Sequence, residues 1–152
     1  MGEDVLLQAI HAEIQARNAY ELLAGRIETE SGRLLMSAMA QEEEGHRATL
    51  ANSYKKLTGT KYEFDPSIRV GPDLSFIKAS VFRHTQALEA LKLALGAEDE
   101  AIAFYTQAMQ NPELKNDKGT FRSLIKFEKK HKKMLTKELE RLEKTNHWNL
   151  PR

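Results

Sequence analysis

The chain has 152 residues, of which 41% are hydrophobic and 30% are charged, a balance that fits one soluble globular domain. Its 23 basic and 22 acidic residues leave a formal net charge of +1, without the basic surplus of a dedicated nucleic-acid-binding protein. There is no cysteine, which excludes disulfides, zinc–thiolate sites and iron–sulfur clusters and favours a cytoplasmic location. No apolar stretch approaches the roughly 20 residues needed to cross a bilayer, so we expect no membrane span.

The first half of the chain predicts two long helices. Residues 3–28 are rich in Ala, Leu, Glu and Gln, and their apolar positions recur every three or four residues, which predicts the first helix. Ser31 or Gly32 interrupts this pattern. The second helix is predicted over 34–57, with Gly59 as its end.

The second half predicts another pair. A third helix begins at about Thr85, which can cap it, and runs to Met109 before Asn111-Pro112 ends it. A fourth helix is predicted over 120–144.

The segment between the two pairs is much longer than the links within them. Residues 58–84 contain four Gly or Pro residues and begin as loop, with a short extra helix possible between Asp73 and Phe82. Short links produce antiparallel neighbours, and a long link can run the whole length of a bundle. We therefore predict a single all-α domain over 1–152, a ferritin-like four-helix bundle in which one crossover joins the helix pairs 3–57 and 85–144.

The two pairs form an internal repeat with a constant offset of 85 positions. The matched residues include two glutamates, two Glu-x-x-His motifs and two tyrosines: Glu13 with Glu98, Glu43 with Glu128, His46 with His131, and Tyr20 with Tyr105. Leucines could coincide by chance in a helical protein. Ionisable residues that coincide at a single offset are a far more specific signal.

The repeated acidic residues fall on the apolar stripe of each predicted helix. In the second helix the stripe steps by three and four through Leu35, Met39, Glu43, His46 and Leu50. Four buried carboxylates would repel one another and lose their hydration, and two divalent cations would neutralise them. Such carboxylate and imidazole ligands suit iron, with manganese as an alternative. The predicted metal ligands are Glu13, Glu43, His46, Glu98, Glu128 and His131. The alternative is a metal-free polar network of the same six residues.

The remaining polar residues give weaker signals. Tyr20 and Tyr105 are equally compatible with core-edge packing and with hydrogen bonds to ligand carboxylates. Residues without a partner pattern are expected on the surface or against a neighbouring subunit: His11, His84, His147, Glu42, Glu44 and Glu100. The lysine run at Lys126, Lys129, Lys130, Lys132 and Lys133 is expected to be a solvated helix face.

At these motifs the sequence resembles the rubrerythrins. The segment 13–20 (EIQARNAY) is similar to their first-helix motif, and 41–46 and 127–131 are similar to their Glu-x-x-His helices. The resemblance covers nearly all of the chain. It implies a non-haem di-iron centre, held by the six residues above, that reduces hydrogen peroxide or reacts with dioxygen. It also implies a homodimer.

Two departures from the rubrerythrin pattern affect the functional expectation. Without cysteine, these residues contain no rubredoxin domain, so the electrons would come from a separate protein such as a rubredoxin. Many rubrerythrins also carry an extra carboxylate where this chain has Ala101, which favours a six-ligand site closer to a ferroxidase centre. A peroxidase is therefore predicted, with ferroxidase activity or iron storage, or a di-iron oxidase, as alternatives.

Overall fold

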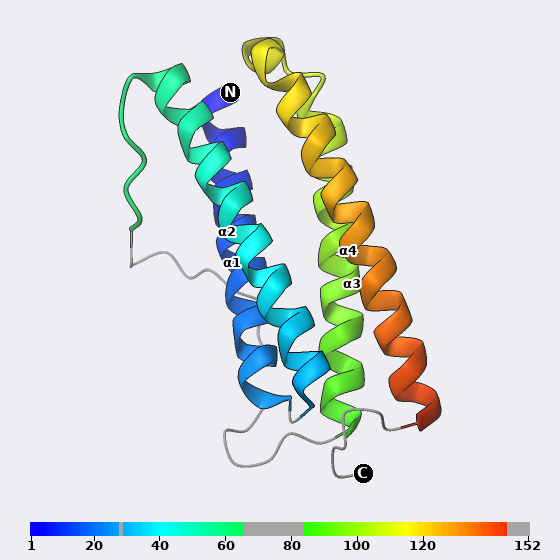
Figure 1. The fold of residues 1–152 in the computed structure, drawn as a ribbon. Coiled ribbons are helices and arrows are strands. Elements are labelled where there is room, and N and C mark those ends of the chain that lie inside the picture. Colours follow the sequence, from blue (N-terminus) through cyan, green and yellow to red (C-terminus); the bar gives the residue numbers. More distant parts are fainter. Residues whose placement is uncertain (28, 66–83, 146–152) are drawn as a thin grey trace.

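The protein is described from a computed structural model, which describes residues 1–27, 29–65 and 84–145. It is an all-helical bundle (Figure 1). The elements are α1 (Gly2–Arg26), α2 (Glu30–Thr58), α3 (His84–Ala108), the short 3₁₀ helix η1 (Pro112–Asp117) and α4 (Lys118–Thr145). No strand occurs in the described ranges, so the predicted ferritin-like, all-α fold is confirmed.

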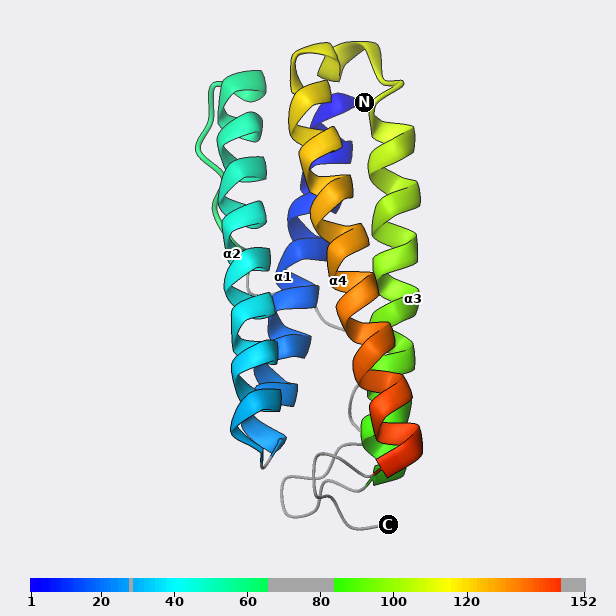
Figure 2. The ribbon, with the colours of Figure 1, turned by 45° about the vertical axis from the view of Figure 1, so that its right-hand side comes forward.

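The four helices form two antiparallel pairs that lie side by side (Figures 1 and 2). Helix α1 packs most closely on α2, and α3 on α4. Helices α2 and α3 run in the same direction, so the chain has to return along the bundle between them. The first part of that crossover, 59–65, runs down beside α2. The short helix predicted between Asp73 and Phe82 lies outside the described residues.

The helix boundaries differ from the prediction at three points. Helix α2 begins at Glu30, because Ile27 and Thr29 are extended and make the turn, while Ser31 and Gly32 fit into the first helical turn. Helix α3 begins at His84, so Thr85 lies within the helix instead of before it. The third difference is η1, where the side chain of Asn111 accepts a hydrogen bond from the backbone N–H of Glu113.

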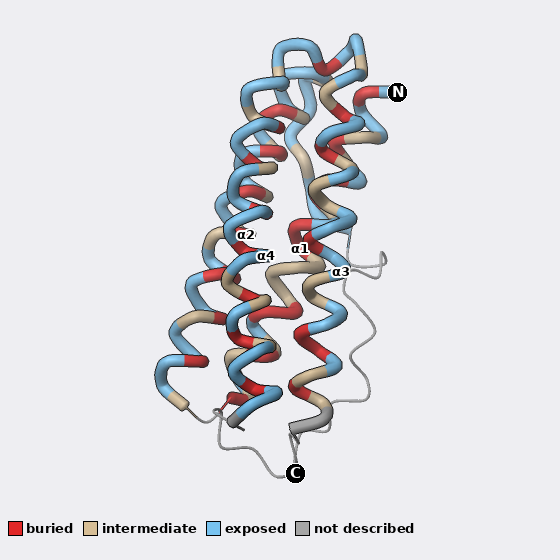
Figure 3. The backbone as a smooth tube through the Cα atoms, turned by 90° about the vertical axis from the view of Figure 1, so that its right-hand side faces the viewer, coloured by how far each residue is buried: buried red, intermediate tan, exposed pale blue. Residues whose placement is uncertain are grey.

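The apolar core consists of two halves, one toward each end of the bundle. One half contains Leu6, Ile10, Leu50 and Phe121, and the other contains Leu23, Met36, Leu91 and Leu135. Figure 3 shows that buried positions line the inner side of the bundle and exposed positions its outer side. Full burial of each large apolar side chain contributes about 1.5–3 kcal/mol, so both halves hold the helices together. No helix in the described part of the chain has the length and apolar character that a membrane crossing requires.

Candidate metal centre

The six predicted ligand residues meet between the two apolar halves. Helices α1 and α3 contribute one glutamate each, and α2 and α4 contribute one Glu-x-x-His motif each. All six are buried, with exposed fractions between 0% and 7%: Glu13, Glu43, His46, Glu98, Glu128 and His131. The three-residue spacing in each motif places the imidazole one turn from its glutamate on the inner face.

The six residues form two overlapping groups, each of which could hold one metal ion. One group contains Glu13 and His46, the other contains Glu98 and His131, and both include Glu43 and Glu128. Within each group the ligand atoms lie within 4.8 Å of one another. The two shared glutamates are therefore placed to bridge two ions, while the other four residues each serve one.

Both imidazoles direct Nδ1 toward the carboxylates. His46 Nδ1 lies 3.3 Å from an oxygen of Glu43 and 3.3 Å from one of Glu128. His131 Nδ1 lies 2.8 Å from Glu43 and 3.5 Å from both Glu98 and Glu128. The same ring nitrogen of each histidine is thus available to a metal ion.

The electrostatics of the metal-free cluster divide the four carboxyl groups into two kinds. Burial raises the pKa of Glu98 to about 9 and holds the pKa of Glu13 well above its usual value. Burial acts in the same sense on Glu43 and Glu128. Polar contacts outweigh it there, chiefly with Glu13 and the imidazoles at Glu43 and with the imidazoles at Glu128, and the pKa of each falls.

The two histidines show the reciprocal effect. Burial alone would lower their pKa values, but the surrounding carboxylates, Glu128 first, raise the pKa of His46 to about 11 and also raise that of His131. The directions of these shifts favour two imidazolium ions, two carboxylates and two protonated carboxyl groups in the metal-free cluster. Their charges sum to zero.

Unsatisfied polar atoms converge at the same place. Four carboxylate oxygens of the cluster are buried without a hydrogen-bond partner: Glu13 Oε2, Glu43 Oε1, Glu98 Oε2 and Glu128 Oε1. His131 Nδ1 also has none, although it lies close to Glu43. Such buried atoms usually find partners, and each one left alone is costly. Two divalent cations would give these atoms a partner and balance four carboxylates, so the residues present fit a dinuclear metal site.

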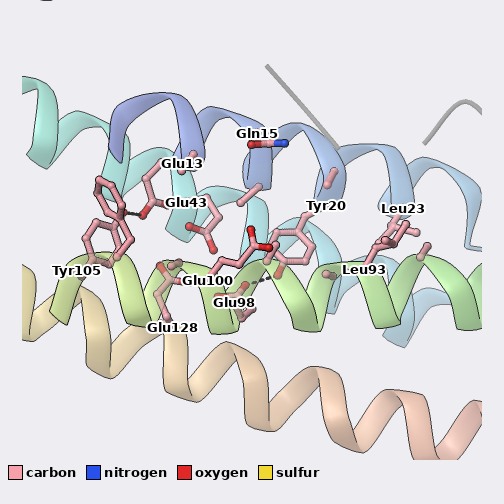
Figure 4. A pocket seen from close by; sticks show the side chains of 18 of the residues that line it. Glu13, Gln15, Tyr20, Leu23, Glu43, Leu93, Glu98, Glu100, Tyr105 and Glu128 are labelled. Atoms are coloured by element: carbon pink, nitrogen blue, oxygen red, sulfur yellow. Dashed lines mark hydrogen bonds between the residues drawn. The ribbon is translucent and has the colours of Figure 1, made fainter. Parts of the chain in front are cut away.

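The two repeated tyrosines hold the glutamates that the two groups do not share. Tyr20 of α1 donates a hydrogen bond to Glu98 of α3, and Tyr105 of α3 donates one to Glu13 of α1 (Figure 4). Both tyrosines are almost fully buried. One hydrogen bond runs from the first helix pair to the second, and the other runs from the second pair to the first. The two halves of the internal repeat are therefore related by an approximate two-fold symmetry around the site.

One of the glutamates that were expected to face water or a neighbouring subunit also contacts a residue of the cluster. Glu42 contacts His131 through a hydrogen bond of 2.5 Å to Nε2, and it lies 3.8 Å from the Lys130 ammonium group. Its side chain is 34% exposed. Glu42 precedes Glu43 by one residue, so it is rotated by about 100° around α2, toward α4. No repeat or stripe marks it, because position 127, its counterpart at the offset of 85, is Phe127.

The other surface expectations have mixed outcomes. The lysine run on α4 and Glu100 are exposed, and Glu44 is half-buried between Arg17 and Arg47 of the same chain. His11 is half-buried, with its ring 6.4 Å from that of Tyr62. The side chain of His84 and residue His147 lie outside what the structure describes.

A cavity of about 280 Å³ opens between α1 and α3 beside the six residues (Figure 4). Its walls are mainly apolar, with alanines prominent among them, and Glu13, Glu43, Glu98 and Glu128 also line it. Ala101 lines the same cavity, so its small side chain leaves open the space beside the carboxylates. A small molecule could therefore reach the cluster from this side of the bundle.

Comparisons with known proteins agree with this arrangement. No curated protein matches the chain. A hypothetical protein from Pyrococcus furiosus has a similar structure, with 29% sequence identity, a TM-score of 0.80, and coverage of 93% of this chain and 90% of that one. The family model described as Rubrerythrin matches residues 4–139, which include all six residues of the cluster. The chain therefore belongs to the rubrerythrin family.

Proposed function

We propose that this chain is a non-haem di-iron redox protein that reduces hydrogen peroxide to water with electrons from a separate donor protein, such as a rubredoxin. The observation that carries the proposal is the pair of overlapping ligand groups with Glu43 and Glu128 in common. Acidic clusters are common on protein surfaces, but these residues are buried. Each of the four glutamates also has one buried carboxylate oxygen without a hydrogen-bond partner. The ligand set suits iron, and manganese remains compatible with it.

The chain itself holds and shields the centre. Glu43 and Glu128 would help to hold both ions, and the other four residues would each hold one ion. When bound, two iron ions would supply the two electrons that reduce the O–O bond. Tyr20 and Tyr105 keep the unshared glutamates in place through their hydrogen bonds, and the two apolar core halves exclude water on both sides.

The overall reaction consumes one hydrogen peroxide, two electrons and two protons and yields two water molecules. The cavity between α1 and α3 is large enough to admit the peroxide and to release water. After each turnover the donor protein would return two electrons to the centre.

The test is stopped-flow spectroscopy of protein loaded anaerobically with ferrous iron and mixed with either hydrogen peroxide or air-saturated buffer. The proposal expects the near-ultraviolet absorption of ferric iron to grow faster with peroxide. Faster oxidation in air would contradict the peroxidase and favour a ferroxidase or oxidase. Size-exclusion mass gives an independent test, because iron storage requires a large shell of subunits whereas the redox enzyme is proposed to be a homodimer.

A di-iron oxidase acting on a small apolar substrate is the second candidate. The apolar cavity beside the carboxylates favours it, since an oxidase needs space for its substrate next to the metal. Ala16→Phe and Ala101→Phe would narrow this cavity. An oxidase would lose substrate turnover in these variants and keep two irons per chain. The peroxidase, which needs room only for peroxide, would be less affected.

A further inference from the structure

The approximate two-fold symmetry of the site is broken at the second nitrogen of the two histidines. The carboxylate contacts of the imidazoles match pairwise at the offset of 85, with Glu13 near His46 and Glu98 near His131. The residues on the outer side of the two imidazoles do not match. Glu42 contacts His131, whereas Phe127, which occupies the equivalent position at the offset of 85, contacts His46. The two ligand groups thus have the same inner shell and different outer partners.

His131 has a carboxylate on its outer side. A carboxylate accepts hydrogen bonds, so the 2.5 Å contact makes Nε2–H the donor to Glu42, and once the ring is neutral the lone pair lies on Nδ1, where a metal ion can bind. This contact fixes the tautomer and the ring orientation, and it makes Nδ1 a stronger base. The Lys130 ammonium, 3.8 Å away, helps to hold the Glu42 carboxylate in place.

His46 has an aromatic ring on its outer side. The Phe127 ring lies 4.9 Å from the imidazole, and among the described residues none forms a hydrogen bond with His46 Nε2. The side chain of His46 is 9% exposed, compared with 0% for His131. On this outer side the ring is therefore held by packing alone, and among the described residues no carboxylate contacts Nε2.

We propose that Glu42 is a positioning residue that makes the two metal positions unequal, so that the position at His131 binds a divalent ion more tightly than the position at His46. This inference rests on the proposed metal centre. Loss of an outer partner of a metal-binding histidine typically weakens metal affinity roughly 10- to 100-fold, and a difference of this size is expected between the two positions. The first ion would occupy the group of Glu43, Glu98, Glu128 and His131.

Anaerobic calorimetric titration of the metal-free protein with ferrous iron tests this inference. The wild-type protein should bind two ions in two steps that differ at least about 10-fold in affinity. Glu42→Ala should weaken the tighter step by roughly 10- to 100-fold and leave the weaker step unchanged. Glu42→Gln should have a smaller effect, because its amide oxygen can still accept the hydrogen bond from Nε2.

The reverse substitution uses the pseudo-symmetric position. Phe127→Glu should give His46 the carboxylate that it lacks and tighten the weaker step, so that the two steps converge. Phe127 is 38% exposed, so a glutamate is tolerated there without burying a charge. Glu140→Gln, which removes one charge at an exposed position of α4, is the matched control and should change neither step.

Two equal steps in the wild-type protein, or two steps that Glu42→Ala weakens equally, would overturn the inference and leave the metal centre intact. Absence of iron binding in the wild-type protein would overturn the metal centre as well. Circular-dichroism melting of the metal-free variants verifies that each is folded. If Glu42→Ala fails to fold, an unchanged weaker step in Phe127→Glu would be sufficient to reject the inference.

Discussion

At the scale of single residues, the cluster is balanced with protons when metal is absent and with cations when metal is present. Without metal, the pKa shifts favour two imidazolium ions that offset the carboxylates of Glu43 and Glu128, and they favour the protonated forms of Glu13 and Glu98. Two divalent ions would instead offset four carboxylates beside two neutral imidazoles. Both states are neutral, which explains how six buried ionisable groups can share one core.

Metal loading should therefore release protons. The pKa of Glu98 is raised to about 9 and that of His46 to about 11, and the pKa values of Glu13 and His131 are raised in the same direction, so these four groups hold their protons more strongly in the metal-free protein. Binding of two divalent ions should release about four protons per chain. A pH indicator in weakly buffered solution measures this release. A release near zero would contradict the protonation states described above.

The two tyrosines should be equivalent. Tyr20→Phe and Tyr105→Phe each remove a hydrogen bond to one unshared glutamate and leave a buried carboxylate oxygen without its partner. Each variant should bind ferrous iron about 10-fold more weakly by calorimetry, because partners of ligand carboxylates tune the affinity of the site. A large loss in one variant and none in the other would show that only one of these hydrogen bonds supports a metal position.

At the scale of helices, periodicity predicted the four helices and the inward direction of the ligands, because a stripe with a step of three or four residues follows directly from helix geometry. The short links within each half of the chain predicted which helices form antiparallel pairs. The turn before α2 was harder to predict, since Ser31 and Gly32 look like a break and are accommodated in the first helical turn. Glu42 was missed because its role depends on the neighbouring helix α4, which no local pattern reveals.

The repeated leucines should matter equally to stability. Leu50 and Leu135 occupy matched positions, one in each core half, and both are fully buried. Replacement of either by alanine should lower the free energy of unfolding by about 2–5 kcal/mol in urea denaturation. Leu34→Ala, at a position that is 63% exposed, is the control and should change it by less than about 0.5 kcal/mol. An equal effect at all three positions would contradict the assigned core.

At the scale of the whole molecule, the site joins the two helix pairs, which pack on each other less closely than the helices within a pair. The tyrosine hydrogen bonds and the two glutamates that both ligand groups share all connect one pair with the other. Metal binding and bundle stability should therefore be coupled. The cavity between α1 and α3 could not be predicted, because it depends on how far apart the two pairs lie.

The metal-free protein should lose stability as the pH rises from 7 to 9. The folded state keeps protons on Glu98, up to a pKa of about 9, and on His46, up to about 11, whereas the unfolded chain releases them near 4.5 and 6.5. The folded state thus binds more protons over this range, so the free energy of unfolding falls with rising pH.

The metal-loaded protein should not show this loss, because its ligands are already deprotonated and ions bind better when fewer protons compete. The increase in melting temperature caused by metal should therefore grow between pH 7 and pH 9 in calorimetric scans. The same increase at both pH values would contradict the coupling between ligand protonation and folding.

The most direct test of the central claim is the number of irons bound per chain after anaerobic loading and removal of free metal. The wild-type protein should hold two. Glu128→Ala, which removes a residue that both ligand groups share, should hold at most one. No stoichiometric iron in the wild-type protein would show that the six buried residues form a metal-free polar network. Two irons in Glu128→Ala would show that the ligands are wrongly assigned.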